Sequence, residues 1–398
     1  MIRRTMMDKD FIKHCTSEVY EEVVGYRRYL HAHPEVSGHE IETTKYLASI
    51  LEKHSIPYTL NPAGNGLIAR IKGNKPGKVL AFRSDIDALP IQEETGLPFA
   101  SEVPGVMHAC GHDCHMAVLL AFGLVLTNHL ELVEGTVVLI FQPSEEKFPG
   151  GAAPMIATGL LDDVEAYYGY HVAPELKTGE IGCNDGPVMA SPTTFRIRVK
   201  GKSGHGAKPQ DTVDPIVIAC QIVLALQTIV SRNVHPCDNV VVSCCQIHSG
   251  TTENVIQESA SIIGTIRTYY ESTAKLVSER MTSIAENISK AMGGSAEVEY
   301  EFTYPAVLNP TDQAELIRQA AKDLGYTPLD NLYPSMVGED FAYYLRHRTG
   351  GHFFLGVGGD CSGTYYPLHS AFMSPDEAAL SVGCEMLLSI YNRVLKSN

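Results

Sequence analysis

The order of helix and strand patterns between residues 193 and 302 limits the possible folds of this chain more than any other feature. An alternating strand (Phe195, Ile197 and Val199) precedes a helix, two further strands, a second helix and a last strand. The predicted ranges of these later elements are 213–231, 240–247, 260–268, 272–292 and 296–302. This β-α-β-β-α-β order is the split βαβ, or ferredoxin-like, unit. The pattern therefore predicts a complete small domain in the middle of the chain.

Strand and helix patterns also alternate on both sides of this unit. Before it, short apolar runs at 66–71, 79–82, 137–141 and 166–170 are separated by a long apolar helical stretch from Asp113 to about His129. After it we predict helices near 312–324 and 339–347, a strand at 352–357 and a last helix. Such alternation favours an α/β sheet covered on both faces. Because 398 residues exceed the usual single core, we predict a discontinuous α/β domain (1–186 and 305–398) with a ferredoxin-like domain (187–304) inserted.

Two motifs predict where helices begin. Ser37 and Glu40 have the spacing of a capping box, which predicts a helix from about 37 to 54 with Ser37 as its cap. The segment Ser374-Pro375-Asp376-Glu377 combines the same spacing with a proline suited to the first helical position. We therefore expect the last helix to begin at Pro375.

Charge and composition exclude several classes of protein. The 31 basic and 46 acidic residues give a net charge of −15, which opposes binding to nucleic acid or anionic lipid. The first ten residues have no apolar core of a signal peptide, and the longest apolar run, Met116 to Leu126, is too short to span a membrane. Ten scattered cysteines without a C-x-x-C motif indicate free thiols in a reducing compartment. We expect a cytoplasmic protein that does not insert into membranes.

Residues His108 to His115 concentrate side chains that bind metals. The segment reads His-Ala-Cys-Gly-His-Asp-Cys-His and lies just before the apolar helix. If the chain is extended here, Cys110 and His112 point to the same side, and Gly111 lets the backbone come close. These two side chains would then chelate one ion. A buried cysteine among hydrogen-bonded histidines is the alternative interpretation.

Two adjacent acids, Glu145 and Glu146, follow an apolar strand that Pro143 ends. Carboxylates at the carboxyl end of a strand face the crevice in which open α/β sheets bind ligands. Adjacent side chains of an extended chain point to opposite sides, so we expect one glutamate to bind a metal while its neighbour faces a water there. By itself the pair would be better explained as part of a solvated loop.

Two isolated histidines complete the set. His171 ends the apolar strand 166–170, and His369 follows Tyr365-Tyr366-Pro367-Leu368 in a loop. Each alone is more often a hydrogen-bonded histidine than a metal ligand. Together with Cys110, His112 and a glutamate they make five ligands from four loops, which suits two ions that share a bridging water.

These segments, together with several others in order, resemble the M20 metallopeptidases. Within that family the chain is similar to the branch of aminoacylases, hippurate hydrolases and auxin-conjugate amidohydrolases. The resemblance covers nearly the whole chain. It rests on Arg27-Arg28-Tyr29-Leu30-His31 with Pro34-Glu35, Arg83-Ser84-Asp85-Ile86-Asp87-Ala88-Leu89-Pro90, the segments 107–115 and 142–146, Gly204-His205, Gly264-Thr265-Ile266-Arg267 and Gly338-Glu339-Asp340-Phe341.

The resemblance implies a metal-dependent amidohydrolase that cleaves N-acyl amino acids, such as acetyl or benzoyl derivatives, into a carboxylic acid and a free amino acid. It places catalysis in the α/β domain, with two divalent ions per subunit held by Cys110, His112, Glu146, His171 and His369. Glu145 would take a proton from the shared water and return it to the leaving amine. A thiolate beside imidazoles suits zinc, nickel or cobalt, and the carboxylates also admit manganese.

The inserted domain would add further groups. His205, which the family supplies from this domain, would stabilise the tetrahedral oxyanion. Asn254 and Arg267 are weaker candidates for substrate binding; a guanidinium matches a carboxylate in a bidentate way. Asp87 is expected to orient a ligand histidine. We also expect the inserted domain to act as a mobile lid and to form the contact of a homodimer or higher homo-oligomer.

Other functions predict different features. A dipeptidase or aminopeptidase on the same scaffold is an alternative activity. Cys110 as a nucleophile activated by His112 or His115 would leave the two glutamates and the two isolated histidines without a role. A binding protein on a degenerate hydrolase scaffold would have lost functional residues, and none is lost here. A zinc deaminase is excluded because its P-C-x-x-C signature is missing.

Overall fold

The computed structural model of the chain describes residues 7–359 and 365–396, which form two compact units. Unit 1 comprises residues 1–188, 308–333 and 340–398, and unit 2 comprises residues 189–307 and 334–339. Residues 334–339, which we assigned to the α/β domain, thus group with the small unit. The N-terminal residues 1–6, part of the segment examined for a signal peptide, and Cys361 lie outside the described residues.

Unit 1 is built on an eight-stranded sheet with the order β1-β2-β4-β3-β5-β16-β6-β15. The central strands β4, β3, β5 and β16 run parallel to one another. β1, β2 and β4 are antiparallel neighbours, as are β16 and β6. The strands are Tyr58–Leu60 (β1), Leu67–Lys72 (β2), Lys75–Asp85 (β3), Glu134–Gln142 (β4), Ala166–Lys177 (β5), Glu180–Gly182 (β6), Thr327–Leu329 (β15) and Thr349–Gly358 (β16).

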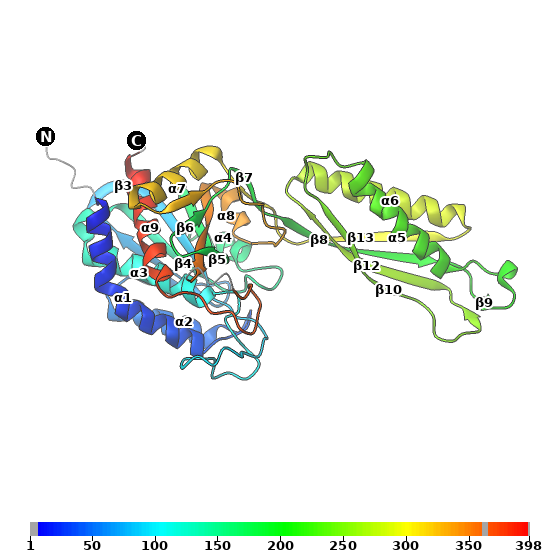
Figure 1. The fold of residues 1–398 in the computed structure, drawn as a ribbon, viewed down its shortest axis with the longest axis horizontal. Helices are drawn as coiled ribbons and strands as arrows, with labels where there is room; N and C mark the ends of the chain where they lie inside the picture. The colour runs from blue at the N-terminus through cyan, green and yellow to red at the C-terminus, as the bar shows by residue number, and fades with distance from the viewer. Residues whose placement is uncertain (1–6, 360–364, 397–398) are drawn as a thin grey trace. The chain divides into compact units, whose positions relative to one another are not determined.

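Helices cover both faces of this sheet (Figure 1). Side chains alternate along β4, so that Leu139 and Phe141 join the larger core with α1, α2, α3, α7 and α9. Val138 and Ile140 face the other way and pack with α4 and α8. The helices are Lys9–Ala32 (α1), Ile41–Lys53 (α2), His112–Asn128 (α3), Leu130–Leu132 (η1), Ala152–Ala157 (α4), Thr311–Leu324 (α7), Ala342–His347 (α8) and Ala379–Lys396 (α9).

Unit 2 has a four-stranded antiparallel sheet in the order β10-β12-β8-β13. Phe195, Ile197 and Val199 alternate with exposed residues on β8 and meet the buried faces of two helices, which lie on one side of the sheet (Figure 1). Its elements are Ser191–Lys200 (β8), Gly204–His205 (β9), Pro209–Asp211 (η2), Pro215–Arg232 (α5), Val241–His248 (β10), Val255–Ile256 (β11), Ser259–Thr268 (β12), Glu271–Ala291 (α6) and Ser295–Phe302 (β13). The short strands Gly186–Met189 (β7) and Val307–Asn309 (β14) pair with each other. The predicted fold class, an α/β protein with a separate small antiparallel domain, is confirmed.

Helix α5 is long and apolar enough to cross a membrane by length and composition alone, and it is the one such helix among the described residues. The helix predicted at 213–231 corresponds to α5, but polar residues such as Gln221 and Gln227 interrupt its apolar runs, so run length alone did not indicate a membrane span. One face of α5, including Ile218, Ile222 and Leu226, is buried in the core of unit 2. The core helix of a folded domain passes the same test of length and composition.

The predicted capping box at Ser37 is wrong. Helix α2 begins at Ile41, and the side chain of Glu40, its N-cap, accepts no hydrogen bond from the helix. The Ser37 hydroxyl instead donates to Asp87 Oδ2 at 2.7 Å, and Glu40 Oε1 accepts the Ser144 amide at 2.8 Å. Both side chains connect distant segments, so tertiary contacts replaced the local cap.

The last helix also begins later than predicted, at Ala379 rather than at Pro375. Asp376 accepts the Ala378 amide at 3.0 Å in a turn before the helix. Glu377 does not act as a cap because its carboxylate forms ion pairs with Arg27 at 3.2 Å and with Arg28 at 2.6 Å. These ion pairs tie the turn to α1.

Candidate metal centre

The candidate site lies where the parallel strands of unit 1 end. β3 ends at Asp85, which is paired in register with Gln142 at the end of β4. On the other side of β3, Phe82 pairs with Tyr168 of β5, so His171 lies three residues further along β5 at the level of Asp85. Carboxyl ends of parallel strands are where open α/β sheets bind ligands. Contrary to the prediction, β5 continues past His171 to Lys177.

A left-handed glycine, not an extended chain, brings Cys110 and His112 together. Gly111 has φ +83° and precedes the first residue of α3, which is His112. A Cβ at Gly111 would lie 2.5 Å from Val172 Cγ2, so a larger residue does not fit here. The predicted extended conformation is therefore wrong, whereas the predicted proximity of the two side chains holds.

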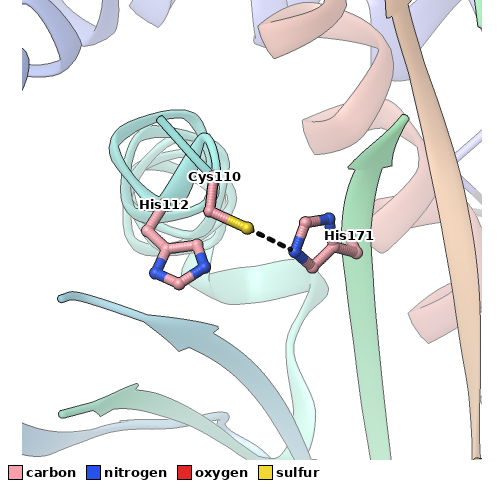
Figure 2. A group of neighbouring side chains, drawn as sticks. All are labelled: Cys110, His112 and His171. Carbon is pink, nitrogen blue, oxygen red and sulfur yellow. Dashed lines mark hydrogen bonds between the residues drawn. The ribbon is translucent and has the colours of Figure 1, made fainter. Parts of the chain in front are cut away.

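Five predicted ligands and the predicted base converge at this place. Cys110, His112 and His171 have donor atoms within 4.8 Å of one another (Figure 2). The same spacing applies to Cys110 with Glu146 and His369, and to His112 with Glu145 and Glu146. Two distances are short: Cys110 Sγ lies 3.4 Å from His171 Nε2, and His369 Nε2 lies 3.2 Å from Glu146 Oε1. The two glutamates reach the same cluster and do not point to opposite sides as predicted.

Both buried histidines turn one ring nitrogen toward the cluster. His112 Nδ1 donates to the backbone oxygen of Asp87 at 2.8 Å, and His171 Nδ1 donates to the backbone oxygen of Val172 at 2.8 Å. His112 Nε2 is buried and has no hydrogen-bond partner among the described residues. A histidine held through one nitrogen by an oxygen acceptor is oriented to bind a metal through the other. The residues present therefore fit a divalent cation.

Negative charge dominates the environment of the cluster. Burial lowers the pKa of His112, but the carboxylates of Asp85 and Asp87 outweigh it and raise that pKa to about 10. Burial and the carboxylates of Glu146 and Glu145 raise the pKa of the Cys110 thiol. A bound cation compensates such an excess of negative charge and deprotonates a coordinating thiol. The same surroundings oppose Cys110 as a free thiolate nucleophile, which needs positive neighbours.

Three buried carboxylates hold the loop that carries Glu145 and Glu146. Glu40 accepts the Ser144 amide at 2.8 Å, and Asp87 accepts the Glu146 amide at 2.9 Å. Asp340 accepts the Gly151 and Ala152 amides, each at 3.0 Å, where the loop ends. Asp87 was predicted to orient a ligand histidine, and its carboxylate lies beside His112. The same carboxylate also accepts the Glu146 amide, so Asp87 contacts both His112 and the glutamate loop.

Asp340 supports a stability prediction. It is fully buried and accepts hydrogen bonds from Arg83 Nη2 at 2.8 Å and from Gln142 Nε2 at 2.8 Å. Removing one partner of a buried ion pair leaves the other charge uncompensated, which costs about 3–5 kcal/mol. We expect Asp340→Ala to lower the free energy of unfolding of metal-free protein by about this amount, as measured by urea denaturation.

A surface ion pair provides the matched control for this variant. Asp163 is 55% exposed and pairs with Arg70 at 2.7 Å. Exposed pairs contribute up to about 1 kcal/mol, so Asp163→Ala should leave the midpoint nearly unchanged. Equal midpoints for the two variants would contradict the role assigned to Asp340.

Asp85 is a functional residue of the site that was not predicted from the sequence. Its Oδ1 accepts from His115 Nδ1 at 2.6 Å, and its Oδ2 accepts from Arg83 Nη1 at 2.7 Å. The Val172 amide donates to His115 Nε2 at 2.9 Å, which places the ring proton on Nδ1. His115 thus connects β3, α3 and β5. An Asp-x-Asp pattern at the carboxyl end of a buried strand was the signal that could have identified Asp85.

His205 and Asn254 lie together in unit 2, and Arg267 lies elsewhere in that unit. β9 and β11 pair His205 with Val255, and the Gly206 amide donates to the Asn254 oxygen at 2.8 Å. His205 comes shortly after Lys200 at the end of β8, and Asn254 comes shortly before Ser259 at the start of β12. Lys200 and Ser259 are paired at the same end of the sheet. Arg267 is eight residues further along β12, which is about 26 Å at the usual rise per strand residue. Its Nε donates to the Met336 oxygen at 3.1 Å.

The chain is similar to known proteins in both sequence and structure. The family model for peptidase family M20/M25/M40 matches residues 81–393. An N-acetylcysteine deacetylase of Bacillus subtilis is 41% identical over 379 residues, or 95% of this chain and 98% of the relative. Thermostable carboxypeptidase 1 of Saccharolobus solfataricus is 36% identical over 378 residues, or 94% of this chain and 95% of the relative.

A solved structure shares the fold over nearly the full length. A dinuclear metal-binding peptidase of the M20 family from Bacillus subtilis superposes with a TM-score of 0.86 at 37% identity. The match covers 96% of this chain and 100% of that protein. The likeness therefore includes both compact units and the segments that carry the cluster.

Proposed function

The chain belongs to peptidase family M20/M25/M40 and is a metal-dependent hydrolase of the amidohydrolase type, and we propose that its substrates are N-acyl amino acids. The observation that carries this proposal is the convergence of Cys110, His112 and His171 with two glutamates at one edge of the sheet. The 41% identical relative is named for removing an acetyl group from N-acetylcysteine, a substrate of this class.

Two cations would be held by the five converging ligands. Cys110 Sγ is close to His171 Nε2, Glu146 Oε1 is close to His369 Nε2, and Cys110 belongs to a three-residue group with each pair. Cations at such a site supply Lewis acidity, which polarises a carbonyl group and makes a water more acidic. A thiolate beside imidazoles favours zinc, nickel or cobalt, and the two carboxylates admit manganese.

Glu145 performs the proton transfers in this proposal. Its carboxylate accepts a proton from the attacking water as the new carbon–oxygen bond forms. It returns that proton to the amide nitrogen as the carbon–nitrogen bond breaks, which releases a carboxylic acid and an amino acid. Glu145 is buried, and Glu40 and Asp87 hold its neighbours, so the carboxylate is positioned before substrate arrives.

The second candidate activity is removal of an amino acid from a peptide. The observation that favours it is the 36% identity to a carboxypeptidase over 94% of this chain. Both reactions hydrolyse the amide bond to the nitrogen of the released amino acid. They differ only in the acyl group on that nitrogen, which is a simple acid in one case and a peptide in the other. A substrate panel separates them.

The test of the proposed function is a panel of amides given to enzyme reloaded with each metal. Acetyl-, benzoyl- and longer acyl-amino acids should give higher kcat/KM than dipeptides or blocked peptides, and chelation should abolish all turnover. A preference for peptides would support the second activity instead. Turnover that survives complete removal of metal would contradict both.

We expect His205 to donate a hydrogen bond to the developing oxyanion. The Ala207 amide donates to His205 Nδ1 at 3.0 Å, so the neutral ring carries its proton on Nε2. The side chain is exposed in unit 2. Removing one such donor costs about 10²–10³-fold in kcat. We therefore expect His205→Ala to lower kcat by this factor, with KM changed much less.

His235 provides a matched control. It is also exposed in unit 2, and its Nδ1 accepts the amide two residues later, from Cys237, at 3.2 Å. His235→Ala should retain full kcat. If His205→Ala also retained full kcat, His205 would have no part in catalysis.

His205 reaches an oxyanion either by closure of its own unit 2 or from unit 2 of a second copy. The connections to unit 1 at 188–189 and 307–308 adjoin the end of the sheet at which Phe302 pairs with Thr193, and His205 follows the opposite end. Mixing inactive Glu145→Gln and His205→Ala chains distinguishes the routes. Activity recovered in mixed oligomers indicates a second copy, whereas no recovery in oligomers shown to be mixed indicates closure within one chain.

We propose that the predicted homodimer forms through the outer face of α5. Ile216, Val217, Leu224 and Val230 are exposed on this helix, and Leu224 is 66% exposed. A charge at the centre of an apolar contact is strongly unfavourable. Leu224→Glu should therefore shift the sedimenting species from dimer to monomer. Leu60→Glu, at an exposed leucine of unit 1, is the control. A dimer that persists in Leu224→Glu would contradict this contact.

A further inference from the structure

A second group of metal-binding side chains lies at the opposite end of α3 from His112. Donor atoms of Cys15, Glu18 and His129 are within 4.8 Å of one another. Cys15 and Glu18 lie one turn apart on α1, and His129 is the C-cap of α3. Because α3 has 17 residues, about 25 Å of helix separates this group from His112. Nothing in the proposed reaction uses these residues.

The donor atoms of Glu18 and His129 are nearly as close as the ligands of a tetrahedral zinc site. Bond lengths to sulfur, nitrogen and oxygen of about 2.0–2.3 Å require donor atoms about 3.4–3.6 Å apart. His129 Nε2 lies 3.9 Å from Glu18 Oε2, so a small side-chain rotation closes the difference. His14 Nε2 lies 3.4 Å from the other oxygen, Glu18 Oε1, which makes this histidine a candidate for a fourth ligand.

The ring of His129 is supported from its other side. Glu131 Oε1 lies 3.7 Å from His129 Nδ1, and the Phe11 ring packs edge-on at a centroid distance of 5.3 Å. The Glu131 carboxylate is 68% exposed and beyond hydrogen-bond distance, so the Phe11 ring is the packed contact of the imidazole. His129 Nε2 lies 3.9 Å from Glu18 Oε2.

The charge and the access also fit a cation. Within residues 7–359 and 365–396, the ion pairs of Glu18 and Glu131 are with histidines and not with lysine or arginine. Glu18 is half exposed and His129 is partly exposed, whereas Cys15 is buried. An ion would therefore enter from the solvent side and meet the thiol last.

We propose that Cys15, Glu18 and His129, with His14 as the fourth ligand, bind a zinc ion or a similar borderline divalent cation that is separate from the catalytic pair. Cysteine, histidine and carboxylate together are the ligands of zinc and cobalt rather than of magnesium or calcium. The ion links the middle of α1 to the end of α3. It is a structural site, and its existence does not depend on the proposed substrate.

Binding at this site releases a proton. The ion binds the Cys15 thiolate, so the thiol must lose its proton on binding. The affinity should therefore increase as the pH rises. This pH dependence distinguishes ligation through sulfur from a weak surface association with Glu18 alone.

Cobalt titration in a Cys110→Ser background tests the proposal. Cys110 is the thiol of the catalytic cluster, so a thiolate-to-cobalt charge-transfer band in this variant must come from another cysteine. We expect such a band at one equivalent, its loss in Cys15→Ser/Cys110→Ser, and retention in the control Cys237→Ser/Cys110→Ser, at an exposed cysteine. No band, or a band that survives Cys15→Ser, would overturn the proposal.

A second measurement avoids the altered catalytic site. Wild-type protein saturated with zinc should contain one zinc more per chain than Cys15→Ser or His129→Ala, and kcat should be the same in all three. Equal zinc contents would overturn the proposal and leave the catalytic pair unaffected. Loss of activity in Glu145→Gln or on chelation tests the proposed function separately.

Discussion

Replacing Glu145 by Gln is expected to reduce kcat by about 10²–10⁴-fold or more while the protein keeps its catalytic cations. A glutamine amide has the size of the carboxylate but cannot accept a proton from water. The five proposed ligands are unchanged, and the loop is held by Glu40, Asp87 and Asp340 through backbone amides that the substitution does not alter. Turnover is therefore lost without loss of the site.

Kinetics and metal analysis on the same sample check this expectation. Glu175→Gln, at an exposed glutamate of β5, makes the same chemical change away from the cluster and should retain wild-type kcat. Glu145→Gln with wild-type kcat would show that another group is the base. Loss of both kcat and metal would place Glu145 among the ligands instead.

Replacing Cys110 by Ser is expected to lower the metal content by at least one ion per chain and to abolish most of the activity. A serine hydroxyl is a poor substitute for a thiolate toward borderline cations. Cys110 Sγ lies 3.4 Å from His171 Nε2 and belongs to both three-residue groups that involve His171 and His369. One substitution therefore removes a donor from the centre of the cluster.

Cys183→Ser is the matched control. Cys183 is as buried as Cys110, but its sulfur contacts the Ala314 and His352 oxygens, outside the cluster. This variant should keep the full metal content and activity. Full metal content with lost activity in Cys110→Ser would support the nucleophile hypothesis, which its surroundings of Glu145 and Glu146 oppose.

The sequence alone predicted most elements of the fold. Periodicity identified the four strands of the main sheet of unit 2 and its two long helices, because each of these elements buries one face in the core of that unit. It also identified α3 and the parallel strands, whose continuous apolar runs reflect burial on both sides. Start signals were less informative, since Ser37 and Glu377 are used in contacts with distant residues that no local pattern records.

The sequence by itself determined the residues of the candidate metal centre, because potential ligands clustered at strand ends are unusual and resemble a known family in order. Only the tertiary structure decided how they converge. Gly111 adopts a left-handed conformation instead of an extended one, and Val172 fills the space in which a Cβ at this position would lie. The tertiary structure also decided that Asp85 and Asp340 support the site. It placed Arg267 near the end of β12 that is remote from His205. The physical reason is that local patterns record which face of an element is buried, whereas the partner of a buried charge comes from distant parts of the chain.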